Sequence, residues 1–110
     1  PVESREFRIK ILAEDFRAEG EAVLDSLAEY AKEQSGWSIA PDNCEGVRVN
    51  LDKAHGDGWF LLRLSLHDPI LPLNIESDRE HGARTIARQL APFLAQQVNI
   101  DASSALEFTL

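Results

Sequence analysis

The chain has 110 residues, enough for one hydrophobic core, and its 44% hydrophobic and 27% charged residues are ordinary for a globular protein. Its formal net charge of −8 argues against a nucleic-acid interface that contacts many phosphates and against docking on anionic membranes. The one cysteine, Cys44, excludes an internal disulfide, and we expect a buried or half-buried thiol there.

The start of the chain carries no signal sequence, and its longest apolar run, Trp59–Leu62, is too short to cross a bilayer. We therefore expect a cytoplasmic protein that is not inserted in a membrane. The chain contains no methionine and opens on Pro1, so either an initiator methionine was trimmed before Pro1 or, as we expect, the sequence is a segment of a longer protein.

The first third of the chain has the pattern of a strand followed by a helix. Apolar and charged residues alternate over Glu6–Leu12, which predicts a half-buried strand. Asp15 is placed to cap a helix whose apolar residues recur at helical spacing and which fades near residues 34–36. A loop over Ser38–Glu45 is expected to follow.

Three short strands come next, and the connections between them are too short for parallel crossovers, so we expect an antiparallel meander. Their predicted bounds are Val47–Leu51, Trp59–Ser65 and Leu71–Ile75. The polar turn Lys53–Gly58 contains two glycines and suits a hairpin. Every second residue from Phe60 onward is predicted to face the helices, whereas Arg63 and Ser65 face away from them.

A second helix is predicted in the last third of the chain. Ser77 and Glu80 form the S-x-x-E pattern of a capping box, and the apolar residues that follow recur at helical spacing. Those residues are Ala83, Ile86, Ala87, Leu90, Phe93 and Leu94. Pro92 lies inside this pattern, so we expect the helix to bend or end there. No element is predicted for residues 98–110, an unassigned tail behind a domain of residues 1–97.

The order strand, helix, three strands, helix predicts an α+β domain. Each helix has one apolar stripe and each strand has one apolar face. The two helices are therefore expected to cover one face of a four-stranded, mainly antiparallel sheet, while the other face stays polar.

The segment Arg63–Pro69 carries the residues best suited to bind an anion. Arg63 offers paired N–H groups that match phosphate oxygens, while Ser65 and His67 add a hydroxyl and an imidazole donor. Backbone N–H groups of the turn would complete such a site. In the alternative interpretation Arg63 forms an ion pair with Asp68, His67 is solvated, and the loop has no ligand.

Other combinations of polar residues give weaker indications of chemistry. The histidines and carboxylates lack the spacing of a metal site, and Ser65, His67 and Asp68 are too close in sequence to converge as a catalytic triad. Trp37 and Trp59 suit stacking on a sugar or base, and equally suit a core or an interface. We therefore expect no metal site and no catalytic residue in this chain.

The motif R-L-S-L-H-D-P at Arg63–Pro69 follows G-W-F-L-L and precedes I-L-P-L-N-I-E-S. It resembles the phosphate-binding loop of the carboxy-terminal domain of the phosphohexomutases, a family that includes phosphomannomutase and phosphoglucomutase. The family's loop usually has the form R-x-S-(G or N)-T-x-P, and the upstream E-G-V-R-V-N is also similar to a strand of that domain. The resemblance extends from about Arg5 to Gln97 and implies the β-α-β-β-β-α order of a TATA-box-binding-protein-like fold.

The resemblance implies that Arg63, Ser65 and His67 bind the phosphate of a hexose phosphate. Leu66 would contribute its backbone, although it replaces a glycine or asparagine that tolerates a left-handed conformation. His67 replaces a threonine, so a titratable ring stands where the family has a hydroxyl. Asp68 could orient Arg63 or His67, or repel the ligand.

The family's phosphoserine, magnesium and sugar-recognition loops belong to preceding domains, and no segment of this chain is similar to them. The resemblance therefore implies a domain that holds no cofactor, is inactive alone, and works with Mg²⁺ bound elsewhere in the full-length enzyme. Its partners would be the preceding domains of its own chain and a hexose phosphate, with mannose favoured. The alternative is a free-standing regulatory module whose polar sheet face binds a partner or small ligand. Neither role involves nucleic acid or a membrane.

Overall fold

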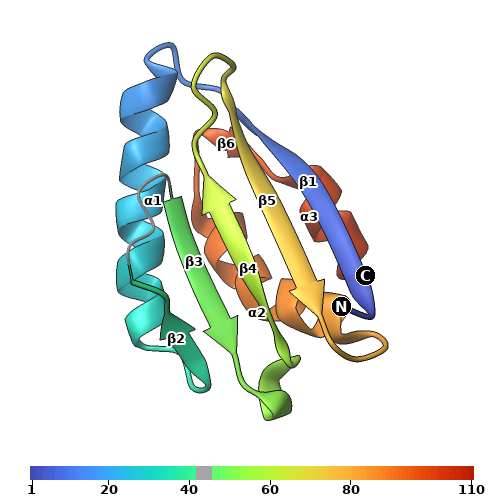
Figure 1. Cartoon of the computed structure of the whole chain (residues 1–110). Helices are drawn as coiled ribbons and strands as arrows, with labels where there is room; N and C mark the ends of the chain where they lie inside the picture. Colours follow the sequence, from blue (N-terminus) through green and yellow to red (C-terminus); the bar gives the residue numbers. More distant parts are fainter. Residues whose placement is uncertain (42–45) are drawn as a thin grey trace.

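The computed structural model describes residues 1–41 and 46–110 (Figure 1). The prediction for Cys44 lies outside these residues. Within them, six strands form one sheet in the order β2-β3-β4-β5-β1-β6, and every neighbouring pair is antiparallel. The strands are β1 (Glu3–Ile11), β2 (Trp37–Ile39), β3 (Gly46–Leu51), β4 (Gly58–Arg63), β5 (Ile70–Ser77) and β6 (Ile100–Asp101). The helices are α1 (Phe16–Lys32), α2 (Gly82–Gln96) and α3 (Ser103–Phe108), with a short 3₁₀ turn, η1 (Lys53–His55).

The predicted α+β class and the antiparallel meander are confirmed, but the sheet is wider than predicted. The four expected strands form its centre, in the order β3-β4-β5-β1, and the two unpredicted strands are its edges. β2 consists of Trp37 and the first two residues of the segment predicted as the loop Ser38–Glu45, and residues 42–45 of that prediction lie outside the described residues. β6 and α3 lie in the tail for which no element was predicted. The predicted numbers of strands and helices are therefore wrong, because the described fold also contains two short edge strands and a third helix.

The helices cover one face of the sheet, and Figure 1 shows the opposite face, with α2 and α3 behind the strands. α1 and α2 meet on the covered face, where the rings of Tyr30 and Phe93 lie 5.4 Å apart. The strands contribute every second residue to this core. Its fully buried strand side chains are Ile9, Val49, Phe60, Leu62, Leu71, Leu73 and Ile75. None of the described helices is long and apolar enough to cross a membrane.

Helix α1 begins where the sequence predicts. The Asp15 carboxylate accepts the backbone N–H of Ala18 at 3.1 Å, and the helix ends at Lys32, slightly before the predicted fade. Its buried residues are Gly20, Val23, Leu27 and Ala31, which lie on one face. Gly20 permits close packing, because a Cβ there would lie 2.5 Å from Cδ1 of Leu64.

Helix α2 begins at Gly82, five residues after Ser77, so the predicted capping box is wrong. Ser77 is the last residue of β5, is buried, and donates its hydroxyl to the carbonyl of Gly56 at 2.6 Å. The first residue of the helix is Gly82, and His81 before it gives no side-chain cap. Ser77 does not cap the helix, because it continues the inward-facing alternation of β5 and its Oγ instead donates to the carbonyl of Gly56, just after η1, and accepts the backbone N–H of Arg79 at 3.2 Å.

The apolar stripe predicted for α2 is confirmed, since all six of its residues are buried. We expected the helix to bend or end at Pro92; it does not end there and continues to Gln96. Pro92 is exposed, so the carbonyl of Arg88 that lacks an N–H partner lies on the side of the helix that faces water. A proline on this side removes one hydrogen bond without disturbing the core.

The tail packs on the same core as the preceding residues. β6 extends the sheet, with Ile100 paired to Ile11, and both side chains are buried. α3 is held against α2 by two arginines, because Arg84 Nε donates to the Phe108 carbonyl at 3.0 Å and Arg88 Nε donates to the Thr109 carbonyl at 2.8 Å. Residues 98–110 are therefore part of the folded domain.

Candidate functional site

Arg63 is the last residue of β4, where it pairs with Gly46 of β3. Phe60 and Leu62 on the same strand are fully buried under the helices, so the alternation directs Arg63 to the open face of the sheet, as predicted. The strand ends here rather than at Ser65, which belongs to the loop that follows. Arg63 is therefore held by a sheet, while the other predicted ligand residues lie on a connection between strands.

The loop between β4 and β5 is closed by its own backbone. The N–H of Ser65 donates to the carbonyl of Ile70 at 3.1 Å, and the N–H of Ile70 donates to the carbonyl of Asp68 at 2.7 Å. The Pro69 carbonyl accepts the N–H of Ile11 at 2.8 Å, which ties the loop to β1. The result is a short loop with fixed ends and an exposed tip at residues 66–69.

Ser65 turns its side chain toward this tip. Its Oγ accepts the backbone N–H of Asp68 at 3.4 Å, which leaves the hydroxyl hydrogen to serve another acceptor. The backbone N–H groups of Leu66 and His67 donate to no group in the described part of the chain. The loop therefore presents several hydrogen-bond donors to solvent at its tip.

Leu66 and His67 are both exposed at this tip. Apart from glycines, the described residues with positive φ are Asp57 and His81, so Leu66 does not occupy the left-handed region. The leucine is therefore unstrained, and the turn differs from one that requires glycine or asparagine at this position. Arg17, at the start of α1, donates to the Leu66 carbonyl at 3.2 Å and places a second guanidinium beside the loop.

The ion pair between Arg63 and Asp68, which was the structural alternative, does not form. The ion pairs of the described chain are Lys32–Glu29, His55–Asp52 and His81–Glu80. Asp68 instead uses its backbone to close the turn. Among the described residues, Asp68 therefore makes no ion pair and no hydrogen bond with Arg63.

The remaining sequence candidates are separate from this loop. His55 Nδ1 lies 2.6 Å from Asp52 Oδ1 in the η1 turn. Trp37 is a core residue whose Nε1 donates to Gln89 at 3.1 Å, whereas Trp59 lies half-buried on the open face of the sheet. Across residues 1–41 and 46–110, no three histidine, cysteine or carboxylate side chains gather as a metal site would require.

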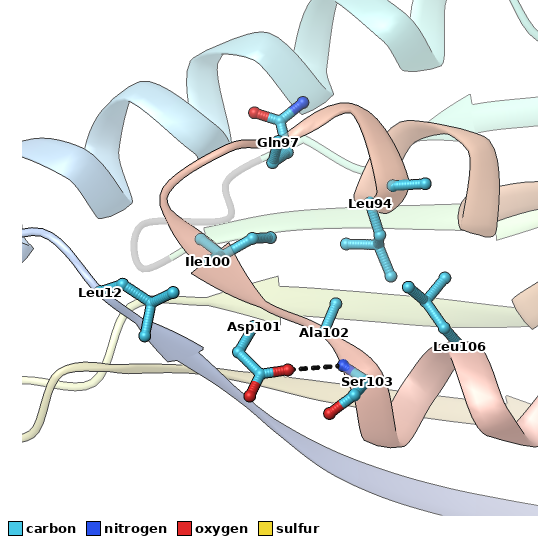
Figure 2. Close-up of a pocket in the computed structure, with 9 residues that line it drawn as sticks. Leu12, Leu94, Gln97, Ile100, Asp101, Ala102, Ser103 and Leu106 are labelled. Carbon is cyan, nitrogen blue, oxygen red and sulfur yellow. Dashed lines mark hydrogen bonds between the residues drawn. The ribbon is translucent and has the colours of Figure 1, made fainter.

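A second feature, which the sequence did not indicate, is an open depression of about 370 Å³ between the end of α2, β6 and α3 (Figure 2). Its walls are mainly apolar and include Leu12, Leu94, Ile100 and Leu106. Among the described residues that line it, Asp101 is the one carboxylate. The Ser103 side chain and the backbone N–H of Ser103, at 3.0 Å, lower the pKa of Asp101. None of the residues that line the depression belongs to the Arg63–Pro69 loop.

Neither a scan against protein-family models nor a search of curated proteins finds a match to this chain.

Proposed function

We propose that the chain is the phosphate-binding carboxy-terminal domain of a sugar-phosphate mutase, an enzyme that moves a phosphoryl group between the 1- and 6-positions of a hexose phosphate. Mannose phosphate is the substrate that the sequence resemblance favours. The observation that carries the proposal is the position of the R-L-S-L-H-D-P motif. Arg63 ends a central strand, and Ser65, Leu66 and His67 follow on an exposed, backbone-closed loop.

The residues of the loop suit one phosphate group. The Arg63 guanidinium offers two parallel N–H donors to two phosphate oxygens, and a strand end is a rigid place for it. The Ser65 hydroxyl, the His67 ring and the exposed N–H groups of Leu66 and His67 offer further donors. A net charge of −8 does not oppose this, because one local site depends on a few aimed donors and salt screens the distant carboxylates.

The role proposed for this domain is binding and orientation of the substrate. The nucleophile and the magnesium ion of such an enzyme would come from preceding domains, and Arg63 would hold the phosphate that is not being transferred. Holding one end of the substrate fixes the position of the other end against the reacting groups, which lowers the entropic part of the barrier. The 110-residue chain alone should therefore bind phosphate compounds without converting them.

The first test is to determine the length and upstream sequence of the reading frame that encodes the chain. The proposal requires several hundred upstream residues with a phosphoserine loop and an aspartate-rich magnesium loop. In that enzyme, Arg63→Ala should lower kcat/KM roughly tenfold to a hundredfold, the scale of a charged hydrogen bond of about 1.5–3 kcal/mol. Arg63→Lys should restore part of the loss, because a lysine keeps the charge and lacks the planar fork.

Arg5→Ala is the matched control, since Arg5 is exposed and its guanidinium lies 5.5 Å from the ring of Phe108 on the covered side of the sheet. Unchanged kcat/KM in Arg63→Ala, or a reading frame that begins near Pro1, would reject the mutase assignment. The second result would favour the other candidate, a free-standing module that binds its partner on the open face. The observation in its favour is the half-buried Trp59 on that face.

A further inference from the structure

The open face of the sheet carries a group of cations beside the Arg63–Pro69 loop. Arg8 of β1 pairs with Pro72, Lys10 pairs with Ile70, and Arg48 of β3 pairs with Leu61 of β4. Together with Arg63, these four side chains alternate with buried residues and therefore share the open face. We call Arg8, Lys10, Arg48 and Arg63 the cationic group. Four of the chain's 11 basic residues therefore share the uncovered sheet face with the carboxylates of Glu6 and Glu76. Three of the four, Arg8, Lys10 and Arg63, lie at the end of the face next to the loop, where they suit an anion.

An aromatic contact lies on the same face. The guanidinium carbon of Arg48 is 4.2 Å from the centre of the Trp59 ring, a close cation–π contact. No described helix covers this side of the sheet, as Figure 1 shows, and Arg48 is partly exposed. A guanidinium held over an indole is a preorganised platform, and nucleic-acid bases stack on both arginine planes and aromatic rings.

The polar neighbours of Trp59 suit the edge of a base. In the sheet register, Asn50 lies on one side of Trp59 and Glu76 on the other. An asparagine amide can donate to and accept from a base edge, and a carboxylate can accept from an exocyclic amino group. Glu76 also disfavours a phosphate at the Trp59 end, whereas Arg8, Lys10 and Arg63 favour a phosphate at the end next to the loop.

The spacing fits a ligand of moderate length. Trp59 and Arg63 are four residues apart on β4, which is about 13–14 Å between Cα atoms, with the half-buried Leu61 between them. The long Arg63 side chain can lean along the face and shorten this distance. One ribose would then span the remaining distance between the Trp59 ring and the Arg63 guanidinium. A polynucleotide is disfavoured by the overall negative charge, but a single nucleotide is not.

From these observations we propose that the open face and the loop together bind a nucleoside phosphate, with its phosphate at Arg63 and the loop, its ribose over Leu61 and its base on the Arg48–Trp59 stack. The phosphate end of this inference rests on the proposed function, whereas the base end rests on Arg48 and Trp59 alone. In a mutase such a ligand would occupy the hexose phosphate position and therefore compete with the substrate.

The test compares AMP with ribose 5-phosphate, which carries the same phosphate and sugar without a base, in NMR titrations of the ¹⁵N-labelled 110-residue chain. AMP should bind about tenfold more tightly, the scale of one base stacked on an aromatic platform. It should also shift the indole N–H of Trp59. The indole N–H of Trp37, which is buried and bonded to Gln89, is the internal control and should stay in place.

Arg48→Lys keeps the charge and removes the planar guanidinium. This variant should reduce the advantage of AMP to less than about threefold and leave the affinity for ribose 5-phosphate unchanged. Arg5→Lys is the matched control, because it alters an arginine over a different ring, that of Phe108, and should preserve the tenfold advantage. Equal affinities for AMP and ribose 5-phosphate in the unmodified chain, or an AMP advantage that survives Arg48→Lys, would overturn the nucleotide proposal.

The outcomes separate this proposal from the proposed function. If both phosphate compounds shift the loop with equal affinity, the phosphate site stands and the nucleotide site falls. If AMP and adenosine shift Trp59 equally and neither AMP nor ribose 5-phosphate shifts residues 63–68, the phosphate site fails, and with it the nucleoside phosphate as ligand. If an acidic peptide such as polyglutamate shifts Arg48 and Trp59 while AMP does not, the open face is a protein-binding surface and the proposal is overturned.

Discussion

The carboxylate of Glu3, near the start of the chain, accepts the backbone N–H of Ala83 at 3.1 Å. It also accepts the N–H of His81 at 2.9 Å, so the first strand supplies the cap that the sequence before α2 does not provide. These two hydrogen bonds lower the pKa of Glu3 below its ordinary value of 4.5, and the bond from His81 has the larger effect. The start of β1 and the start of α2 are thus joined by an anion at a helix N-terminus.

The first prediction concerns the pH dependence of this cap. Because the folded pKa of Glu3 is depressed, its stabilising contribution is complete above pH 4.5 and is lost as the pH falls through the lower folded value. Glu3→Gln should therefore lower the Tm at pH 7, and the difference from the unmodified chain should shrink toward pH 3. Thermal unfolding across this range checks it, with the exposed Glu21→Gln of α1 as control. A difference in Tm that is independent of pH would contradict the assignment.

The capping of α2 also shows what local patterns can predict. The S-x-x-E pattern at Ser77 and Glu80 satisfies every local criterion of a capping box, yet the bonds that decide the matter come from Glu3 and Gly56. Contacts between residues so far apart in the sequence cannot be recognised from a short local motif. Periodicity did predict the four central strands and two long helices, because each buries one regular face.

The edges of the sheet were missed for a different reason. β2 and β6 have three and two residues, too few for alternation to be visible. At the site, the alternation through Phe60 and Leu62 correctly predicted the face of Arg63. The Arg48–Trp59 contact could not be predicted, because it depends on how two strands pair.

A second prediction concerns Ser77. Ser77→Ala removes the donor to the Gly56 carbonyl and should lower the free energy of unfolding by about 1–3 kcal/mol, the cost of leaving a buried polar group without its partner. Urea denaturation measures the change. Ser26→Ala, on the exposed side of α1, should change the stability by less than about 0.5 kcal/mol. If the two variants are equally stable, the Ser77 bond contributes nothing to folding.

The third prediction concerns the tail. A chain ending at Gln97 loses β6, α3 and the buried Ile100, and should be destabilised by about 2 kcal/mol or more, since burying one such side chain contributes about 1.5–3 kcal/mol. Removing Leu110 alone is the control, because its side chain is 89% exposed. Equal urea midpoints for the chain ending at Gln97 and the full chain would mean that the domain ends near residue 97.

The most direct test of the phosphate site is a titration of the ¹⁵N-labelled 110-residue chain with mannose 6-phosphate. Binding at the loop should shift the backbone N–H signals of residues 64–68 first, with the largest changes at Leu66 and His67, exposed residues whose N–H groups make no hydrogen bond within the described chain. Arg63→Ala should abolish these shifts, and Arg5→Ala should preserve them. Saturable shifts in residues 64–68 that require Arg63 are the result we predict. Unchanged loop signals at high ligand concentration, or identical shifts in Arg63→Ala, would contradict the account.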